Sequence, residues 1–295
     1  MTEVIRQESN VVRVGCLSGP NLAREILSGQ PAATVIASEF DEVIKLGGKP
    51  FIIPAMGSHG GATAEGQLKV LTGYGITEER MGVPIKSSME VIRIGESREG
   101  IPVYVDKNAL TADHIVVINR VKSHTRFIGK IESGLIKMLM VGLGKDTGAK
   151  IYHRAIMKYS FDQIIASVLP VIQSKLPVLF GLAIIENAFG DVAQIQAVPG
   201  EDFIKVEPKL KKYSFKMMAK LPIRDIDLLI VDEIGKDISG TGMDTNVIGR
   251  RDETSIEEVR IARIFVRDLT SQSHGNACGI GLADFTTKKL VDKIK

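Results

Sequence analysis

Short apolar runs recur along the chain, separated by polar segments that contain glycine or proline. These runs span Pro50 to Pro54, Ile101 to Val105, His114 to Asn119, Leu179 to Ile185 and Leu228 to Val231. Apolar runs of this length bounded by turn residues predict buried strands. Segments of helical period lie between several of them, at 34–46 before the first run and 161–174 before the fourth. This alternation predicts parallel strands joined by crossover helices, which is an α/β fold.

The length of the chain predicts two domains, although one compact domain is also possible. With 295 residues, of which 44% are hydrophobic, the chain can bury a large core. We expect two Rossmann-like domains with mostly parallel sheets, at 1–160 and 161–295, and a site in the cleft between them. The boundary is placed near Lys158 to Asp162. The charged segment from Gly200 to Arg224 is typical of a solvated surface helix within the second domain.

Charge and cysteine content narrow the class of partner. The 38 Lys and Arg against 35 Asp and Glu give a net charge of +3, with no basic run of the kind that binds nucleic acid. A small organic ligand is therefore the expected partner. The two cysteines, Cys16 and Cys278, form no C-x-x-C pair, which argues against a disulfide framework and a structural zinc site. The polar N-terminus and the lack of a long apolar run predict a cytoplasmic protein that does not enter the membrane.

Ionisable side chains follow three of the predicted strands. His59 lies in M-G-S-H-G-G-A-T after the first, Arg120 and His124 lie in N-R-V-K-S-H after the third, and Lys236 lies in D-E-I-G-K-D after the fifth. Ligands of open α/β sheets bind beyond the carboxyl ends of the strands. The sequence therefore predicts a ligand site at these strand ends, at an interface between domains.

Lys137 is unusual because apolar residues surround it in G-L-I-K-M-L-M-V-G. Burying an ammonium group is costly unless the group has a function, and apolar neighbours favour its neutral form. His153 follows 16 residues later, and spacing alone leaves open whether the two share a site. The nearby G-L-G-K-D-T-G matches neither a Rossmann nor a Walker pattern and is interpreted as a structural turn. His114 and His274 are interpreted as structural.

From about Gly48 to its end, the chain resembles the nickel-dependent lactate racemase superfamily, in a branch of shorter chains. The resemblance rests on P-A-M-G-S-H-G-G-A-T, G-V-P-I-K-S-S-M-E-V, V-I-N-R-V-K-S-H-T-R-F-I-G-K-I-E-S-G-L-I-K-M-L-M-V-G-L-G-K, Y-H-R-A and V-D-E-I-G-K-D-I-S-G-T-G-M-D. It implies an isomerase that racemises or epimerises a small 2-hydroxy acid. The cofactor it implies is the nickel-pincer nucleotide, a pyridinium mononucleotide that carries two thiocarbonyl groups and holds nickel.

The resemblance also implies a role for individual residues. Lys137 matches the lysine that forms a thioamide with the cofactor, and His153 matches the histidine that ligates nickel. His59 and His124 match the two histidines that exchange the hydroxyl proton of the substrate while its hydride passes to the cofactor and back. Histidine suits this work because its pKa lies near neutrality.

A cation is required for the substrate carboxylate, and either Lys236 or Arg120 is expected to supply it. Lys236 lies in the part of the sequence that carries the resemblance, in D-E-I-G-K-D.

The first 43 or so residues resemble a different family. V-G-C-L-S-G-P-N-L-A-R-E-I-L is similar to an internal segment of NAD-dependent glycerol-3-phosphate dehydrogenase, but no G-x-G-x-x-G strand precedes it. Ser18 and Gly19 are candidates to hold the phosphate of the mononucleotide in a glycine turn. The chain also ends earlier than lactate racemases do, which predicts a shortened C-terminal domain. Two alternative functions therefore remain: an NAD-dependent dehydrogenase, and a non-catalytic ligand-binding homologue.

Overall fold

The computed structural model describes residues 14–18, 43–124, 129–250 and 259–295. These residues fall into two compact units, Met1–Lys122 with Ile128–Met218, and Ser123–Phe127 with Ala219–Lys295. The boundary expected near 158–162 lies inside the first unit. Strands on either side of that position pair in one sheet, so the chain does not separate there.

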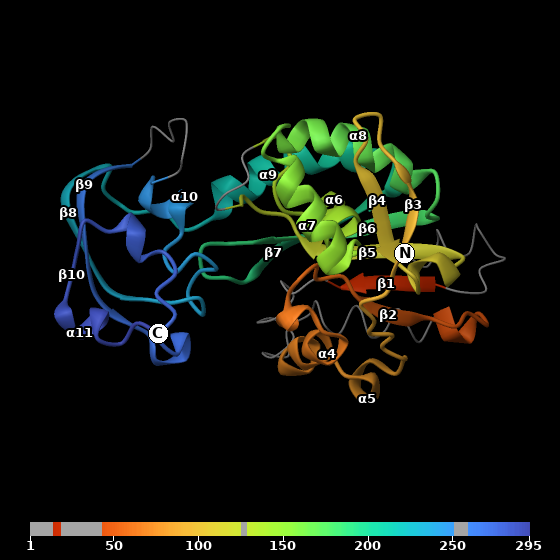
Figure 1. Ribbon diagram of the computed structural model, residues 1–295, viewed down its shortest axis with the longest axis horizontal. Coiled ribbons are helices and arrows are strands. Elements are labelled where there is room, and N and C mark those ends of the chain that lie inside the picture. Colours follow the sequence, from red (N-terminus) through yellow and green to blue (C-terminus); the bar gives the residue numbers. More distant parts are fainter. Residues whose placement is uncertain (1–13, 19–42, 125–128, 251–258) are drawn as a thin grey trace. The chain divides into compact units, whose positions relative to one another are not determined.

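A five-stranded sheet forms the centre of the first unit (Figure 1). Its order is β2-β1-β5-β6-β7, and only β7 is antiparallel to its neighbour. The strands are β1 (Val14–Ser18), β2 (Phe51–Pro54), β5 (His114–Arg120), β6 (Val178–Glu186) and β7 (Val192–Pro199). Three of the predicted strands are thus confirmed as β2, β5 and β6. The interior of β5 is buried without interruption, as expected for a parallel strand covered on both faces.

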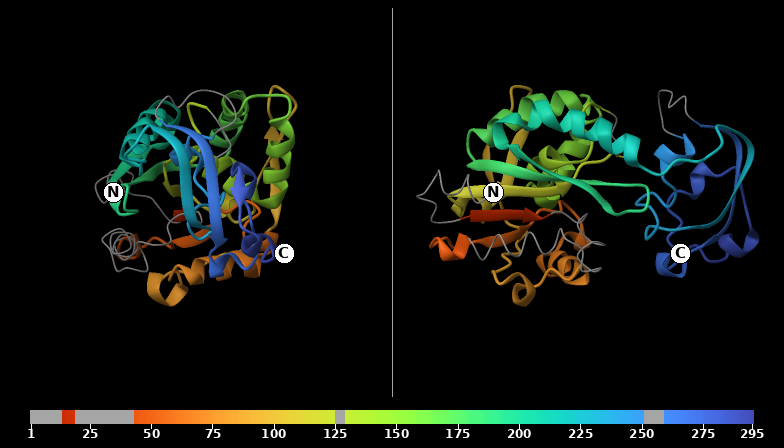
Figure 2. Two further views of the ribbon diagram at one scale, coloured as in Figure 1. Left: turned by 90° about the vertical axis from the view of Figure 1, so that its left-hand side faces the viewer. Right: turned by 180° about the vertical axis from the view of Figure 1, so that it is seen from behind.

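Helices lie on both sides of this sheet, with α4 and α5 on one face and α6 to α9 on the other (Figures 1 and 2). They are α4 (Ala64–Gly73), α5 (Glu78–Met81), α6 (Leu135–Lys137), the π-helical turn η3 (Met138–Gly142), α7 (Lys145–Ala155), α8 (Phe161–Gln173) and α9 (Phe203–Met217). Short 3-10 turns are η1 (Gly60–Ala62), η2 (Ala109–Thr111) and η4 (Gly200–Asp202). The predicted helix at 161–174 is confirmed as α8, whereas most of the one at 34–46 lies outside the described residues.

Helix α9 confirms the predicted surface helix but belongs to the first unit. Its exposed side carries lysines, while Phe203, Glu207 and Leu210 are buried. One of these buried residues is a carboxylic acid, which the charged sequence pattern did not reveal.

The strand expected at 101–105 pairs differently from the prediction. It is β4 (Pro102–Asp106), and it forms a separate antiparallel pair with β3 (Val91–Glu96). A tight turn joins them, in which the Ser97 amide donates to the Ile101 carbonyl at 2.8 Å. A parallel connection needs a crossover of a dozen or more residues, so this short link dictates a hairpin.

The second unit contains a smaller parallel sheet of order β10-β9-β8. Its elements are β8 (Asp225–Ile234), α10 (Thr245–Ile248), β9 (Arg260–Leu269), η5 (Ser271–Ser273), η6 (Ile280–Leu282), β10 (Phe285–Thr286) and α11 (Lys288–Val291). The run at 228–231 is confirmed as part of β8. The fold is therefore mixed α/β with partly parallel sheets, and the arrangement of two Rossmann-like domains around a cleft stays a prediction. Within the part of the chain that the structure describes, no helix has the length and apolar character needed to span a membrane.

Candidate active site

The glycine loop after β2 packs directly against the chain segment that follows Lys137. The Gly57 amide donates to the Gly142 carbonyl at 3.2 Å, and Gly57 has a φ of +58°. A methyl group on Gly142 would lie 2.7 Å from the Ala55 carbonyl oxygen, and one on Gly57 would lie 3.2 Å from the Val141 carbonyl oxygen. Only glycine permits this close approach of two backbones. The loop is thereby held against η3.

Lys137 ends α6 and leads into η3. Desolvation by the surrounding protein lowers the pKa of Lys137 from its ordinary value of 10.5 to about 8; the Lys122 ammonium adds to this effect and the Glu132 carboxylate opposes it. Roughly a tenth of the Lys137 amine is then neutral at pH 7, far more than for an ordinary lysine. The pKa thus shifts in the direction that the apolar neighbours in the sequence indicated.

The turn that begins α6 is fixed by three hydrogen bonds from two other segments. The Asn119 side-chain amide donates to the Gly134 carbonyl at 3.0 Å, and the Ile136 amide donates to Glu207 Oε2 at 3.0 Å. The Lys122 amide donates to the Ser133 carbonyl at 2.9 Å. These contacts join the end of β5 and the middle of α9 to the turn. They therefore restrain the backbone that leads to Lys137.

Glu207 is a buried acid whose titration should be measurable as a change in stability. Burial raises the pKa of Glu207 from 4.5 to about 7, against the effect of the backbone amides that donate to it. Because folding raises the pKa of Glu207, its protonation contributes fully to the free energy of unfolding below pH 4.5. This contribution is lost as the pH rises through about 7. The loss amounts to at most roughly 3 kcal/mol.

We therefore expect Glu207→Gln to remove this dependence. The difference in unfolding free energy between the variant and the wild type should grow in favour of the variant from pH 4.5 to 8. Urea denaturation at several pH values measures it, with the exposed Glu201→Gln as control. If the unfolding free energies of the wild type and of Glu207→Gln changed with pH in parallel, Glu207 would not titrate in this range.

His59 and His153 are both exposed and both belong to the first unit. His59 lies in the glycine loop, immediately before η1, and His153 lies on α7, two residues before its end. Gly57 thus joins the loop of His59 to η3, which lies along the chain between Lys137 and α7, the helix of His153. Among the described residues, no three His, Cys, Asp or Glu side chains form a cluster that could hold a metal ion by themselves.

The other predicted site residues lie in both units of the chain. His124 and Lys236 belong to the second unit, where His124 is partly buried and Lys236 is exposed after β8. Arg120 is mostly buried at the end of β5 and forms an ion pair with Glu186. Ser18 ends β1 in register with Pro54, at the carboxyl edge of the sheet. Gly19 lies outside the described residues.

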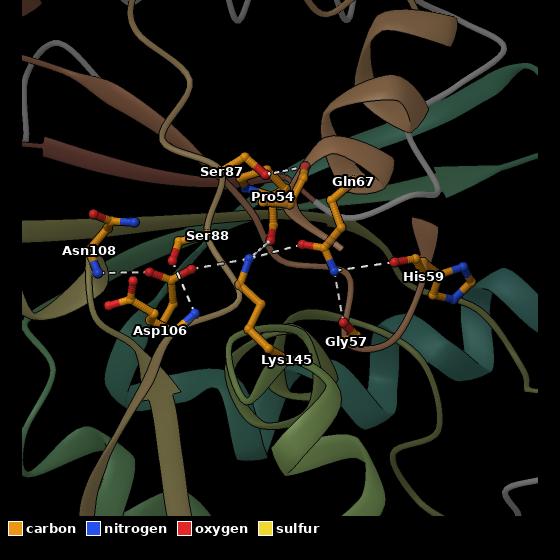
Figure 3. A network of polar contacts seen from close by, with 11 residues as sticks. Pro54, Gly57, His59, Gln67, Ser87, Ser88, Asp106, Asn108 and Lys145 are labelled. Carbon is orange, nitrogen blue, oxygen red and sulfur yellow. Dashed lines mark hydrogen bonds and ion pairs between the residues drawn. The ribbon is translucent and has the colours of Figure 1, made fainter. Parts of the chain in front are cut away.

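Three buried polar residues of this region were not identified from the sequence: Gln67, Asp106 and Lys145 (Figure 3). The Lys145 ammonium lies 3.1 Å from Asp106 Oδ2, and both side chains are completely buried. Burial raises the pKa of Asp106 and lowers that of Lys145, and each charge opposes the shift of the other. The only sequence signal was the lysine in G-L-G-K-D, which was interpreted as part of a turn.

Two known families match separate parts of the chain. Residues 32–163 match the family described as the lactate racemase N-terminal domain, a range that includes His59, His124, Lys137 and His153. Residues 1–44 match the N-terminus of NAD-dependent glycerol-3-phosphate dehydrogenase. The chain thus combines a mixed α/β fold with a region similar to the lactate racemase N-terminal domain. Both resemblances inferred from the sequence are thereby confirmed.

Two solved structures share the fold. The lactate racemase apoprotein from Thermoanaerobacterium thermosaccharolyticum matches with a TM-score of 0.59 and 12% identity, over 98% of this chain and 82% of that one. A protein from Thermotoga maritima matches with a TM-score of 0.52 and 15% identity, over 90% of this chain and 68% of that one. At such identities these similarities concern the fold alone.

Curated relatives that match the chain are glycerol-3-phosphate dehydrogenases, and they match it over different lengths. Glycerol-3-phosphate dehydrogenase [NAD(P)+] of Saccharophagus degradans is 51% identical over 45 residues, which are 15% of this chain and 13% of the relative. The enzyme from Pseudomonas fluorescens is 26% identical over 226 residues, covering 69% of this chain and 62% of the relative. The chain thus spans only a small part of the first of these enzymes and less than two thirds of the second.

Proposed function

We propose that this protein racemises or epimerises a small 2-hydroxy acid, with a nickel-pincer nucleotide attached to Lys137. The observation that carries the proposal is the environment of Lys137. Its amine has a pKa of about 8, and the turn η3 that follows it accepts a hydrogen bond from Gly57 of the His59 loop and is followed along the chain by α7, the helix of His153. A covalent bond to nitrogen requires the neutral amine, so a lowered pKa favours attachment.

The residues present fit this group in two respects. Lys137 supplies the neutral nucleophile, and the exposed imidazole of His153 is a suitable ligand for nickel. Ser18, which ends β1, is proposed to hold the phosphate together with Gly19. When bound, the group would take up the hydride from the substrate carbon and return it to either face.

Proton transfer at the substrate hydroxyl is assigned to His59 and His124. One imidazole accepts the hydroxyl proton of one enantiomer, and the other imidazole accepts that of the opposite enantiomer. Two bases are needed because the hydroxyl groups of the two enantiomers lie on opposite faces of the planar keto acid. The substrate carboxylate is assigned to Lys236 or Arg120. The pairing of Arg120 with Glu186 favours Lys236, which has no comparable buried carboxylate among the described contacts.

The test is the mass of the intact protein. The protein is produced together with the enzymes that make the cofactor and with nickel, and its mass is compared with that of Lys137→Arg. We expect an adduct of one nucleotide on the wild type, located at Lys137 by peptide mapping, and none on Lys137→Arg. The control Lys150→Arg changes an exposed lysine of α7 and should retain the adduct. An unmodified wild type under these conditions contradicts the proposed function.

The dehydrogenase alternative is favoured by one observation, the match of residues 1–44. It requires that the chain bind a nicotinamide nucleotide and transfer hydride to free NAD. Absorbance at 340 nm with 2-hydroxy acids and NAD distinguishes the two enzymes, because racemisation produces no free NADH. A homologue that only binds a ligand would show neither the adduct nor NADH.

A further inference from the structure

The side chain of Gln67 connects the His59 loop to the buried ion pair (Figure 3). Gln67 lies on α4 and is completely buried. Its Nε2 donates to the Gly57 carbonyl at 2.8 Å and to the His59 carbonyl at 3.4 Å, and its Oε1 accepts from the Lys145 ammonium at 3.0 Å. The amide has only one orientation that satisfies all three partners, since carbonyls cannot donate and an ammonium cannot accept. Gln67 thus holds the loop by two of its carbonyl groups, that of Gly57 and that of His59 itself.

Lys145 occupies a backbone conformation that is unfavourable for its residue type. It begins α7 with a φ of +53°, in the left-handed region, which costs a residue with a side chain about 1 kcal/mol. Its ammonium also donates to the Pro54 carbonyl, at the end of β2, and pairs with Asp106. A strained conformation persists only where the surroundings determine it, and such conformations cluster at functional sites. The helix that carries His153 begins at this residue, three residues after η3 ends.

We propose that Gln67 and Lys145 are positioning residues of the racemase site, which fix the His59 loop relative to the start of the helix that carries His153. This inference rests on the proposed function, because it gives the network a purpose in catalysis. Neither side chain reaches solvent, so neither contacts the substrate. Their contribution is the placement of the His59 imidazole, which is assigned to the substrate, relative to the His153 imidazole, which is assigned to nickel, and the rate depends on this placement.

The experiment compares Gln67→Met with two other variants. Gln67→Met keeps the volume of the side chain and removes its hydrogen bonds, while Gln67→Glu keeps an acceptor for Lys145 but no longer donates to the loop. The matched control is Gln173→Met, because Gln173 on α8 also donates from its side-chain amide to a glycine carbonyl, that of Gly200 at 3.0 Å. Circular dichroism establishes that each variant is folded.

Two readouts are taken from each variant. Hydrogen exchange of the amides at 57–62, measured by mass spectrometry on protein without cofactor, should accelerate at least about tenfold in Gln67→Met and Gln67→Glu and remain unchanged in Gln173→Met. In the loaded enzyme, kcat should fall by about 10- to 100-fold with KM nearly constant, while the Lys137 adduct still forms.

The possible results separate the two proposals. Unchanged hydrogen exchange of the loop overturns the positioning role, whatever the activity. Faster exchange with an unchanged kcat overturns it as well, as does an equal loss of kcat in Gln173→Met. A wild type that lacks both adduct and racemisation overturns the proposed function and the catalytic purpose of the network, while hydrogen exchange still decides whether Gln67 holds the loop.

Discussion

Replacing His59 with asparagine is expected to lower kcat/KM for racemisation by about 10²- to 10⁴-fold, and His124→Asn should do the same. Asparagine keeps a polar side chain but cannot accept and release a proton near neutral pH. The two enantiomers have equal free energy, so kcat/KM must fall equally in both directions even though each histidine faces one enantiomer. Chiral chromatography of reactions started from each pure enantiomer measures this.

The control for these variants is His274→Asn. His274 is exposed in the second unit and has a left-handed φ of +50°, which asparagine tolerates well. The variant His274→Asn therefore removes an imidazole without disturbing the fold, and we expect it to leave racemisation unchanged. Full activity in His59→Asn or His124→Asn would remove that residue from the mechanism, and formation of the Lys137 adduct in each variant shows that cofactor attachment has not been lost instead.

Much of the fold could be predicted because its strands are continuously apolar. β5 and β6 are buried in a parallel sheet, so their sequences H-I-V-V-I-N and L-F-G-L-A-I-I are apolar without alternation. The pairing partners were harder to predict, since the hairpin of β3 and β4 depends on one short turn. The division into units was also not encoded locally, because it depends on which strands pair across long sequence distances.

The interior strand β1 was not predicted. Its sequence V-G-C-L-S contains a glycine and only three strongly apolar residues, and it lies in the segment similar to a dehydrogenase. It nevertheless pairs with β2 on one side and β5 on the other. Sheet pairing uses backbone groups rather than side chains, so a short strand whose sequence resembles another family can still lie between two strands of this sheet. This position brings Ser18 to the edge where the His59 loop begins.

The candidate site was partly accessible from the sequence. Lys137 was conspicuous because its neighbours are apolar, and its lowered pKa follows from the same neighbours. The supporting network was not accessible, because Gln67, Asp106 and Lys145 come from three separated segments that look like ordinary polar surface in sequence. Only the folded chain brings them together, as a closed set of donors and acceptors in the core.

Asp106→Ala is expected to lower the unfolding free energy of the first unit by about 3–5 kcal/mol. Both members of the Asp106–Lys145 pair are completely buried, so removing the carboxylate leaves an ammonium in the core with only uncharged partners. The chain contains no tryptophan, so urea denaturation is followed by circular dichroism at 222 nm. The control is the neighbouring Lys107→Ala, which breaks the exposed ion pair with Glu90 and should cost about 1 kcal/mol or less.

A double variant distinguishes the cost of an unpaired charge from the value of the pair itself. Replacing a buried ion pair by apolar residues is often nearly neutral, so Asp106→Leu combined with Lys145→Met should recover part of the stability lost in Asp106→Ala. Recovery should be incomplete, because the Pro54 carbonyl and Gln67 Oε1 lose the ammonium that now donates to them. If the double variant were less stable than Asp106→Ala, the ammonium would be stabilising the core chiefly through these two oxygens, and the ion pair would be the smaller contribution.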